Sequence, residues 1–137
     1  MIWETSIKTT VVDKNGNDKT SISRYIVENA ELFGEVEKRL YEEFGNETGF
    51  EVATIKISKL KEIINEAPQG DECKIYFATI CDHIMTDEGD VKDMQYSVAL
   101  HAHDINEAHK AIDQYMKQGM EDMELVGLKC TKYISVL

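Results

Sequence analysis

The sequence is short of proline and glycine, with one proline and eight glycines among its 137 residues. Such a chain has little material for flexible linkers, collagen-like repeats or low-complexity segments. The hydrophobic fraction of 42% is ordinary for a folded globule. Because the length is that of one ordinary domain, we expect a single compact domain over residues 1–137.

Cysteine is also scarce. Cys73, Cys81 and Cys130 are odd in number and widely spaced, and no CxxC pair occurs. This pattern does not fit a disulfide framework. Because the three cysteines stand in apolar alternating segments, we interpret them as reduced and mostly buried thiols.

Positive charge is in short supply, with fifteen basic residues against 26 acidic ones and a formal net charge of −11. Such a surplus of negative charge repels phosphate backbones and anionic lipid. We therefore expect no general nucleic-acid binding and no membrane binding. A protein partner is the more natural target of an acidic surface.

Long apolar segments are missing as well, since no stretch approaches the roughly 20 residues of a membrane-spanning helix. The first ten residues, MIWETSIKTT, lack a basic segment followed by an apolar core, so they do not resemble a signal peptide. We expect a soluble, cytoplasmic protein.

What is present is an internal repeat of secondary-structure signals. β-branched segments on both sides of Asn15-Gly16 predict a hairpin, apolar residues at helical spacing predict a helix, and alternation predicts a following strand. The same order returns in the second half. The predicted strands are 2–12, 20–28, 50–60, 73–84, 94–102 and 123–137, and the predicted helices are 29–44 and 105–118.

The two halves correspond at individual positions. Tyr25-Ile26-Val27 matches Tyr96-Ser97-Val98, and the segment 55–60 matches 128–133. We therefore predict an α+β protein built of two tandem ββαβ pseudo-repeats, about 1–60 and 73–137, joined by 61–72.

A helix between the second and third strands of a repeat implies a right-handed crossover. The third strand is then parallel to the second and lies most simply beside the first. The two repeats form either one mainly antiparallel six-stranded sheet or two three-stranded sheets, with two helices in either case. We favour the joined six-stranded sheet.

Several segments carry a resemblance to a known family. They are Trp3-Glu4, Tyr25-Ile26-Val27, Glu35-Val36-Glu37, Ile55-Lys56-Ile57, the segment CKIYF at 73–77 and Asn106-Glu107-Ala108. With these features the chain resembles, over nearly its whole length, a family of small proteins of unknown function from Bacteroidetes and their crAss-like phages. The resemblance implies a phage or mobile-element context and brings no catalytic residues with it.

The segment LHAHDINEAH, residues 100–109, is the densest in chemically active side chains. His101, His103 and His109 with Asp104 offer imidazole and carboxylate ligands of the kind that bind zinc. However, neither HExxH nor an HxHxD pattern occurs. Asp104 followed by Glu107 forms a capping box, so we interpret the segment as a polar junction between strand and helix and expect neither a metal nor a cofactor.

Two residues stand at the predicted helix starts, Asn29 and Asp104. Backbone amides at helix N-termini bind anions. This gives an alternative function, a small-ligand or nucleotide-binding module that uses the cleft between the two repeats, although no glycine-rich phosphate loop accompanies it.

Catalytic patterns are weak. Cys81 and His83 are neighbours on one face of the strand 73–84, but no oxyanion loop accompanies them. We therefore assign no catalytic residues and predict that the protein is not an enzyme.

The strand 73–84 is apolar on both faces, with Tyr76, Ala78 and Ile80 on one of them. Both faces then need cover, and a second subunit is one way to provide it. We take these three residues as candidates for a homodimer interface. The main functional prediction is a small, acidic, non-enzymatic protein that acts through protein–protein contacts.

Overall fold

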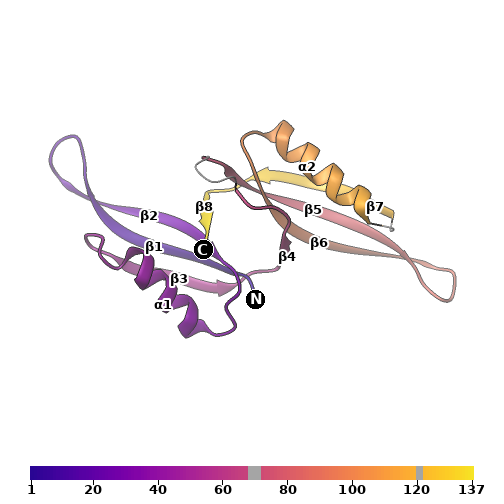
Figure 1. Ribbon diagram of the computed structural model, residues 1–137, viewed down its shortest axis with the longest axis horizontal. Coiled ribbons are helices and arrows are strands. Elements are labelled where there is room, and N and C mark those ends of the chain that lie inside the picture. Colours follow the sequence, from indigo (N-terminus) through magenta and orange to yellow (C-terminus); the bar gives the residue numbers. More distant parts are fainter. Residues whose placement is uncertain (68–71, 120–121) are drawn as a thin grey trace. The chain divides into compact units, whose positions relative to one another are not determined.

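The structure, a computed structural model, describes residues 1–67, 72–119 and 122–137. The described part is an α+β protein with two helices and eight strands, arranged in two four-stranded mixed sheets (Figure 1). The chain divides into two compact units. Unit 1 consists of Met1–Ser58 and Tyr133–Leu137, and unit 2 consists of Lys59–Lys132.

Unit 1 holds the first sheet, in the order β3-β1-β2-β8. Its elements are β1 (Trp3–Val12), β2 (Asp18–Val27), α1 (Phe33–Phe44), β3 (Glu51–Ile57) and β8 (Tyr133–Val136). The predicted hairpin turn is present between β1 and β2, where Asp13 Oδ1 accepts hydrogen bonds from the backbone N–H groups of Asn15 and Asn17. Gly16 has a φ of 79°, which an L side chain rarely adopts.

The core of unit 1 lies between α1 and one face of its sheet. Val36 and Leu40 of α1 are fully buried and pack with Trp3, Ile7 and Val27 of the sheet. The indole N–H of Trp3 donates a hydrogen bond of 2.8 Å to the carbonyl of Ala30. The start of β1 is thereby joined to the connection that leads from β2 into the helix.

Unit 2 holds the second sheet, in the order β4-β6-β5-β7. Its elements are β4 (Leu60–Ile63), β5 (Lys74–Met85), β6 (Val91–Ala102), α2 (Ile105–Gln118) and β7 (Asp122–Cys130). Ala108 and Ile112 of α2 are fully buried against Val98 and Leu100 of β6 and their neighbours on β5. Figure 1 shows each helix lying along one face of its own sheet.

The predicted placement of the third strand in each half of the chain is confirmed. β3 is antiparallel to β1, and β7 is antiparallel to β5. Since β2 and β6 are antiparallel to the same two strands, β3 and β7 run parallel to β2 and β6, as the crossover rule predicts.

The predicted six-stranded sheet is wrong, and so is the count of three strands in the alternative arrangement. Each predicted last strand is interrupted, at Ser58-Lys59 and at 131–132, and continues as a short strand that pairs elsewhere. β4 pairs in parallel with β6, and β8 pairs in parallel with β2. The outer edges of both hairpins are occupied in this way, so each sheet ends at four strands.

The short strands also change the predicted boundaries. β8 comes last in the chain but belongs to unit 1, and β4 follows β3 but belongs to unit 2. The predicted repeats 1–60 and 73–137 therefore exchange their last strands. The connector 61–72 is partly strand, and its predicted turn at Gly70 lies outside the described residues.

The two helices of the described part are short. Neither α1, with 12 residues, nor α2, with 14, could cross a membrane.

We predict that Ile112→Ala lowers the free energy of unfolding by about 2–5 kcal/mol, because it removes a fully buried side chain and leaves a cavity under α2. Ile105→Ala, on the exposed side of the same helix, is the matched control and should change it by less than about 1 kcal/mol. Urea denaturation of both variants measures the difference. Equal losses would contradict the placement of the core.

Candidate functional site

The three histidines of the segment 100–109 have separate surroundings. His101 is buried in β6, whereas His103 and His109 are exposed at the start of α2 and within it. Each ring contacts a different partner. Within the described residues, the one group of three or more metal-binding side chains that converges is a different set, formed by Cys81, His83 and Asp93.

His101 is held by Asn65, which follows β4. The backbone N–H of His101 donates to Asn65 Oδ1 over 2.6 Å, and Asn65 Nδ2 donates to the carbonyl of His101 over 2.9 Å. The ring Nδ1 lies 3.1 Å from the carbonyl oxygen of Asn65. His101 therefore helps to fix the segment after β4 along the edge of β6.

His103 and His109 each pair with an acidic residue four positions later in the chain. His103 Nδ1 lies 2.9 Å from a carboxylate oxygen of Glu107, and His109 Nδ1 lies 3.2 Å from one of Asp113. His103 Nε2 is also 3.6 Å from the sulfur of Cys73. Exposed pairs of this kind stabilise a helix only slightly.

Asp104 is the N-cap of α2, as predicted. Its backbone is extended, and its carboxylate accepts a 2.8 Å hydrogen bond from the N–H of Glu107. In a complete capping box the Glu107 carboxylate would accept a hydrogen bond from the backbone N–H of Asp104. Here that carboxylate contacts the His103 ring instead. The carboxylate of Asp104 thus accepts the hydrogen bond of one of the backbone N–H groups at this helix start.

The prediction that the first helix starts at Asn29 is wrong. α1 begins at Phe33, and its N-cap position is Leu32, which makes no side-chain capping bond. Asn29 instead has a φ of 59°. Asparagine tolerates this left-handed conformation better than most residues do, and it therefore serves the turn between β2 and α1 rather than the helix.

The predicted interface residues Tyr76, Ala78 and Ile80 lie in the core of unit 2. All three are buried on the face of β5 that α2 covers. The helix of the same unit therefore provides the cover that we expected from a second subunit, and these side chains are not available for a homodimer contact.

The converging side chains lie on the other face of β5. Successive residues of a strand point to opposite faces, so Cys81 and His83 face away from Tyr76, Ala78 and Ile80. In the ladder, His83 stands opposite Asp93 of β6, and Cys81 stands opposite Glu124 of β7. We call Cys81, His83, Asp93 and Glu124 the His83 cluster.

The geometry of the His83 cluster is tight around the imidazole ring. His83 Nδ1 lies 2.6 Å from Asp93 Oδ1, and Nε2 lies 3.4 Å from Glu124 Oε2. One ligand atom each of Cys81, His83 and Asp93 lie within 4.8 Å of one another. Three adjacent strands thus bring sulfur, nitrogen and oxygen donors to one point of the sheet.

The carboxylates shift the titration of their neighbours. Hydrogen bonds to Asp93 and then to Glu124 raise the pKa of His83 above its ordinary value. Burial, followed by the charges of Asp93 and Glu124, raises the pKa of the Cys81 thiol. A thiol that stays protonated is a poor nucleophile, so this arrangement does not activate Cys81 for covalent catalysis.

Sequence reasoning found half of the His83 cluster. Cys81 and His83 are visible as same-face neighbours on one strand. Asp93 falls between the predicted strands 73–84 and 94–102, whereas it lies in β6, and Glu124 comes from a strand on the other side of β5. Only the register across strands could have found these two.

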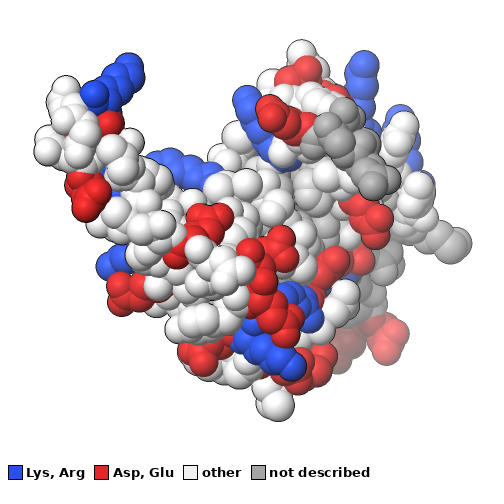
Figure 2. Space-filling model, turned by 60° about the vertical axis from the view of Figure 1, so that its left-hand side comes forward, with Lys and Arg blue, Asp and Glu red and all other residues white. Residues whose placement is uncertain are grey.

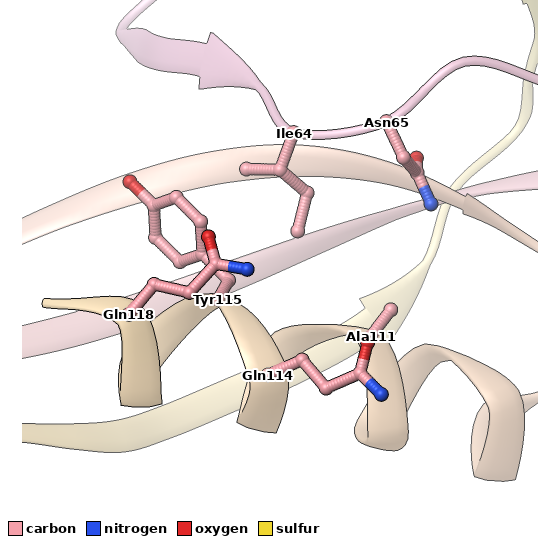
Figure 3. A pocket seen from close by; sticks show the side chains of 6 residues that line it. All are labelled: Ile64, Asn65, Ala111, Gln114, Tyr115 and Gln118. Carbon is pink, nitrogen blue, oxygen red and sulfur yellow. The ribbon is translucent and has the colours of Figure 1, made fainter.

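A shallow pocket lies elsewhere in unit 2 (Figure 3). It has a volume of about 190 Å³. Ile64 and Asn65, after β4, face Ala111, Gln114, Tyr115 and Gln118 of α2 across it. Sites for drug-sized ligands usually measure about 300–1,000 Å³, so this pocket is small for a nucleotide.

The fold and the cluster define a small α+β protein whose mixed sheets are each covered by one helix, with a group of potential metal ligands on the opposite face of one sheet. The family model described as "Domain of unknown function (DUF4494)" matches residues 1–137. The chain belongs to this family. No match was found among curated proteins or among solved structures.

We predict that Asp104→Ala lowers the free energy of unfolding by about 0.5–2 kcal/mol, because it removes the hydrogen bond to the Glu107 N–H. Asn106→Ala, two residues further on and exposed, is the control and should stay within about 0.5 kcal/mol of the parent protein. Thermal denaturation measures both. An unchanged stability of the Asp104 variant would remove the assigned capping role.

We predict a pH-dependent effect of His83→Gln. Because the folded pKa of His83 is raised above 6.5, the stabilisation by its carboxylate partners is fully present below about pH 6.5 and is lost as the pH rises through the raised pKa. The melting temperature of the variant should therefore fall below that of the parent protein at low pH, and the two should converge at high pH. His109→Gln removes an exposed helical pair and serves as control; a constant gap for His83→Gln across pH would be inconsistent with this assignment.

Proposed function

We propose that this protein is a small, acidic, non-enzymatic binding protein that acts through protein–protein contacts in the cytoplasm, in a phage or mobile-element context. The observation that carries the proposal is the end of the β5–β6 hairpin. We call residues 84–94 the acidic hairpin tip. Within the described residues, the ladder between β7 and β5 ends at His83, and the tip consists of the ends of β5 and β6 and the turn that joins them.

The acidic hairpin tip combines exposed apolar side chains with carboxylates. Met85 and Val91 stand directly opposite each other in the ladder and are 73% and 63% exposed. The tip holds one basic residue, Lys92, and four acidic ones, Asp87, Glu88, Asp90 and Asp93. Methionine adapts its shape to different partners, so the tip suits a basic partner that also offers an apolar side chain.

The other hairpin provides a comparison within the chain. Val11 and Val12 near its tip are also exposed, but residues 13–19 hold two acidic and two basic side chains. Figure 2 shows acidic side chains spread over the visible face with basic ones between them. The net charge alone therefore does not locate a binding surface, whereas the joint presence of carboxylates and exposed apolar residues singles out the acidic hairpin tip.

The alternative function, a small-ligand or nucleotide-binding module, has less support. The pocket beside α2 is small for such ligands, and at the start of α2 the Glu107 N–H already donates to Asp104. The homodimer stays a prediction, and its interface would have to use residues other than Tyr76, Ala78 and Ile80.

We also infer that the two halves are copies of one unit. The supporting observation is the shared order of connections, because each sheet places the third strand beside the first and a parallel short strand beside the second. A duplication accounts for this order and for the matching segments of the two halves. We propose this duplication together with the relationship to proteins of Bacteroidetes and their crAss-like phages.

The proposal predicts that the protein retains a basic protein from a bacterial host lysate and that binding weakens as salt rises. In titrations of the purified partner, Met85→Ser with Val91→Ser should weaken the affinity at least about tenfold, because each side chain loses apolar burial worth about 1.5–3 kcal/mol. Val11→Ser with Val12→Ser is the matched control on the other hairpin.

Charge reversal supplies the second arm of this experiment. Asp87→Lys with Glu88→Lys should reduce both the affinity and its dependence on salt, whereas Asp18→Lys on the first hairpin should leave both nearly unchanged. A partner that binds all four variants equally well would rule out the acidic hairpin tip as the binding surface.

A further inference from the structure

We propose that the His83 cluster is a binding site for one zinc ion, with Cys81 Sγ, a ring nitrogen of His83 and carboxylate oxygens of Asp93 and Glu124 as ligands. The site lies within unit 2 and does not depend on the proposed partner binding. It also differs from the histidine segment 100–109, whose rings are separated by other contacts.

The donor set fits the chemistry of zinc. Tetrahedral zinc sites in proteins use cysteine sulfur, histidine nitrogen and carboxylate oxygen at about 2.0–2.3 Å. A site of sulfur, nitrogen and oxygen is unsuited to magnesium or calcium, which prefer oxygen ligands alone. One thiolate and one imidazole therefore favour zinc over the common alkaline-earth ions.

The distances permit closure around an ion. Bonds of that length place tetrahedral ligands roughly 3.3–3.8 Å apart, and the donors of Cys81, His83 and Asp93 already lie within 4.8 Å of one another. Bringing these three donors to that spacing takes movements of about 1 Å at the side-chain ends, whereas Glu124, which contacts the other ring nitrogen of His83, reaches the ion by a change of rotamer. The Asp93 and Glu124 side chains are 61% and 70% exposed, so they can change rotamer without disturbing the core.

The scaffold that holds the donors is firm. Cys81 and His83 belong to the central strand β5, which pairs with a strand on each side along this stretch. Sites built on strands hold their ligands more precisely than sites built on loops. Cys81 is 6% exposed, so its sulfur is sheltered from bulk solvent.

Local charge also favours a cation. Carboxylate oxygens of Asp93 and Glu124 lie 2.6 and 3.4 Å from the two ring nitrogens of His83, and Asp122 stands opposite His83 in the ladder, so three acidic residues lie around a single imidazole. Asp82 lies between Cys81 and His83 in sequence, on the opposite face of β5. It is 6% exposed, and its Oδ1 has no hydrogen-bond partner within the described residues. The acidic residues around this stretch of β5 outnumber the single histidine, and a divalent ion would offset their excess negative charge.

Zinc uptake must release protons. The S–H bond of Cys81 breaks as the S–Zn bond forms, and the proton passes to the buffer. His83 must present a neutral ring nitrogen, so any proton on that nitrogen is released as well. The bound ion would tie β5 to β6 and β7 at the base of the acidic hairpin tip.

Cobalt(II) replaces zinc as a spectroscopic probe for the test on the full chain. We expect one equivalent of cobalt to give a thiolate-to-metal charge-transfer band and the intense visible bands of a tetrahedral site, both removed by one equivalent of zinc. Cys81→Ser should lose the charge-transfer band. Replacing both Cys73 and Cys130 with serine leaves Cys81 as the only thiol and should retain that band.

Carboxylate and imidazole variants test the rest of the site. His83→Gln should weaken zinc binding at least roughly 100-fold, since the loss of contacts outside the ligand sphere already costs about 10- to 100-fold. Asp93→Asn and Glu124→Gln change exposed side chains and keep the variants folded, and each should weaken binding at least about tenfold. His103→Gln, beside Cys73, is the matched control and should bind zinc like the parent protein.

Three results would overturn the proposal. They are the absence of saturable uptake of zinc or cobalt at one equivalent, a charge-transfer band that persists in Cys81→Ser, and unchanged zinc affinity in both Asp93→Asn and Glu124→Gln. Circular dichroism of each variant separates loss of the site from loss of the fold. Because the measurements need no protein partner, they fail or succeed independently of the proposed function.

Discussion

The pairing of β5 on both sides is the constraint from which the arrangement of unit 2 follows. Its ladder with β6 extends along the whole strand, and its ladder with β7 covers residues 76–83. A strand held on both edges cannot rotate, so the alternation of its side chains is fixed. Tyr76 and Ile80 are thereby placed under α2, whereas Cys81 and His83 are placed on the opposite face with the carboxylates of the neighbouring strands.

The hairpins, the α2 helix and the position of the third strand in each half could be predicted from sequence because each depends on local signals. The turn at Asn15-Gly16 and the start of α2 at Asp104 follow from the conformations that these residues prefer. The order of strands within each half follows from the handedness of crossovers. Nothing in these rules requires knowledge of contacts between distant parts of the chain.

The exchange of the short strands could not be predicted in the same way. β4 and β8 have four residues each, which is too short for alternation to separate them from the strands that precede them. Their partners, β6 and β2, are distant in sequence, and local propensity carries no information about which edge a strand will join. The six-stranded sheet was wrong because it left both of these edges unoccupied.

The candidate site shows the same division between local and distant information. Asn29 was misassigned because an asparagine near a helix start is more often a cap than a left-handed turn residue. The histidines at 101, 103 and 109 are close in sequence, which made them candidates for a shared metal site, yet in the structure each ring contacts a different residue. Asp93 and Glu124 are distant from His83 in sequence, and they contact it because two ladders bring them to the same level of the sheet.

Protons and zinc would compete for the same ring nitrogens of His83. When the ring is protonated, both nitrogens donate, and the contacts to Asp93 on β6 and Glu124 on β7 join three strands through hydrogen bonds. When the ring is neutral, one nitrogen can bind a metal ion, and the same carboxylates can join it as ligands. In both states His83 would link β5 to its neighbouring strands at the base of the acidic hairpin tip. The two states differ at Cys81, because its sulfur would bind only when a metal ion replaces the proton.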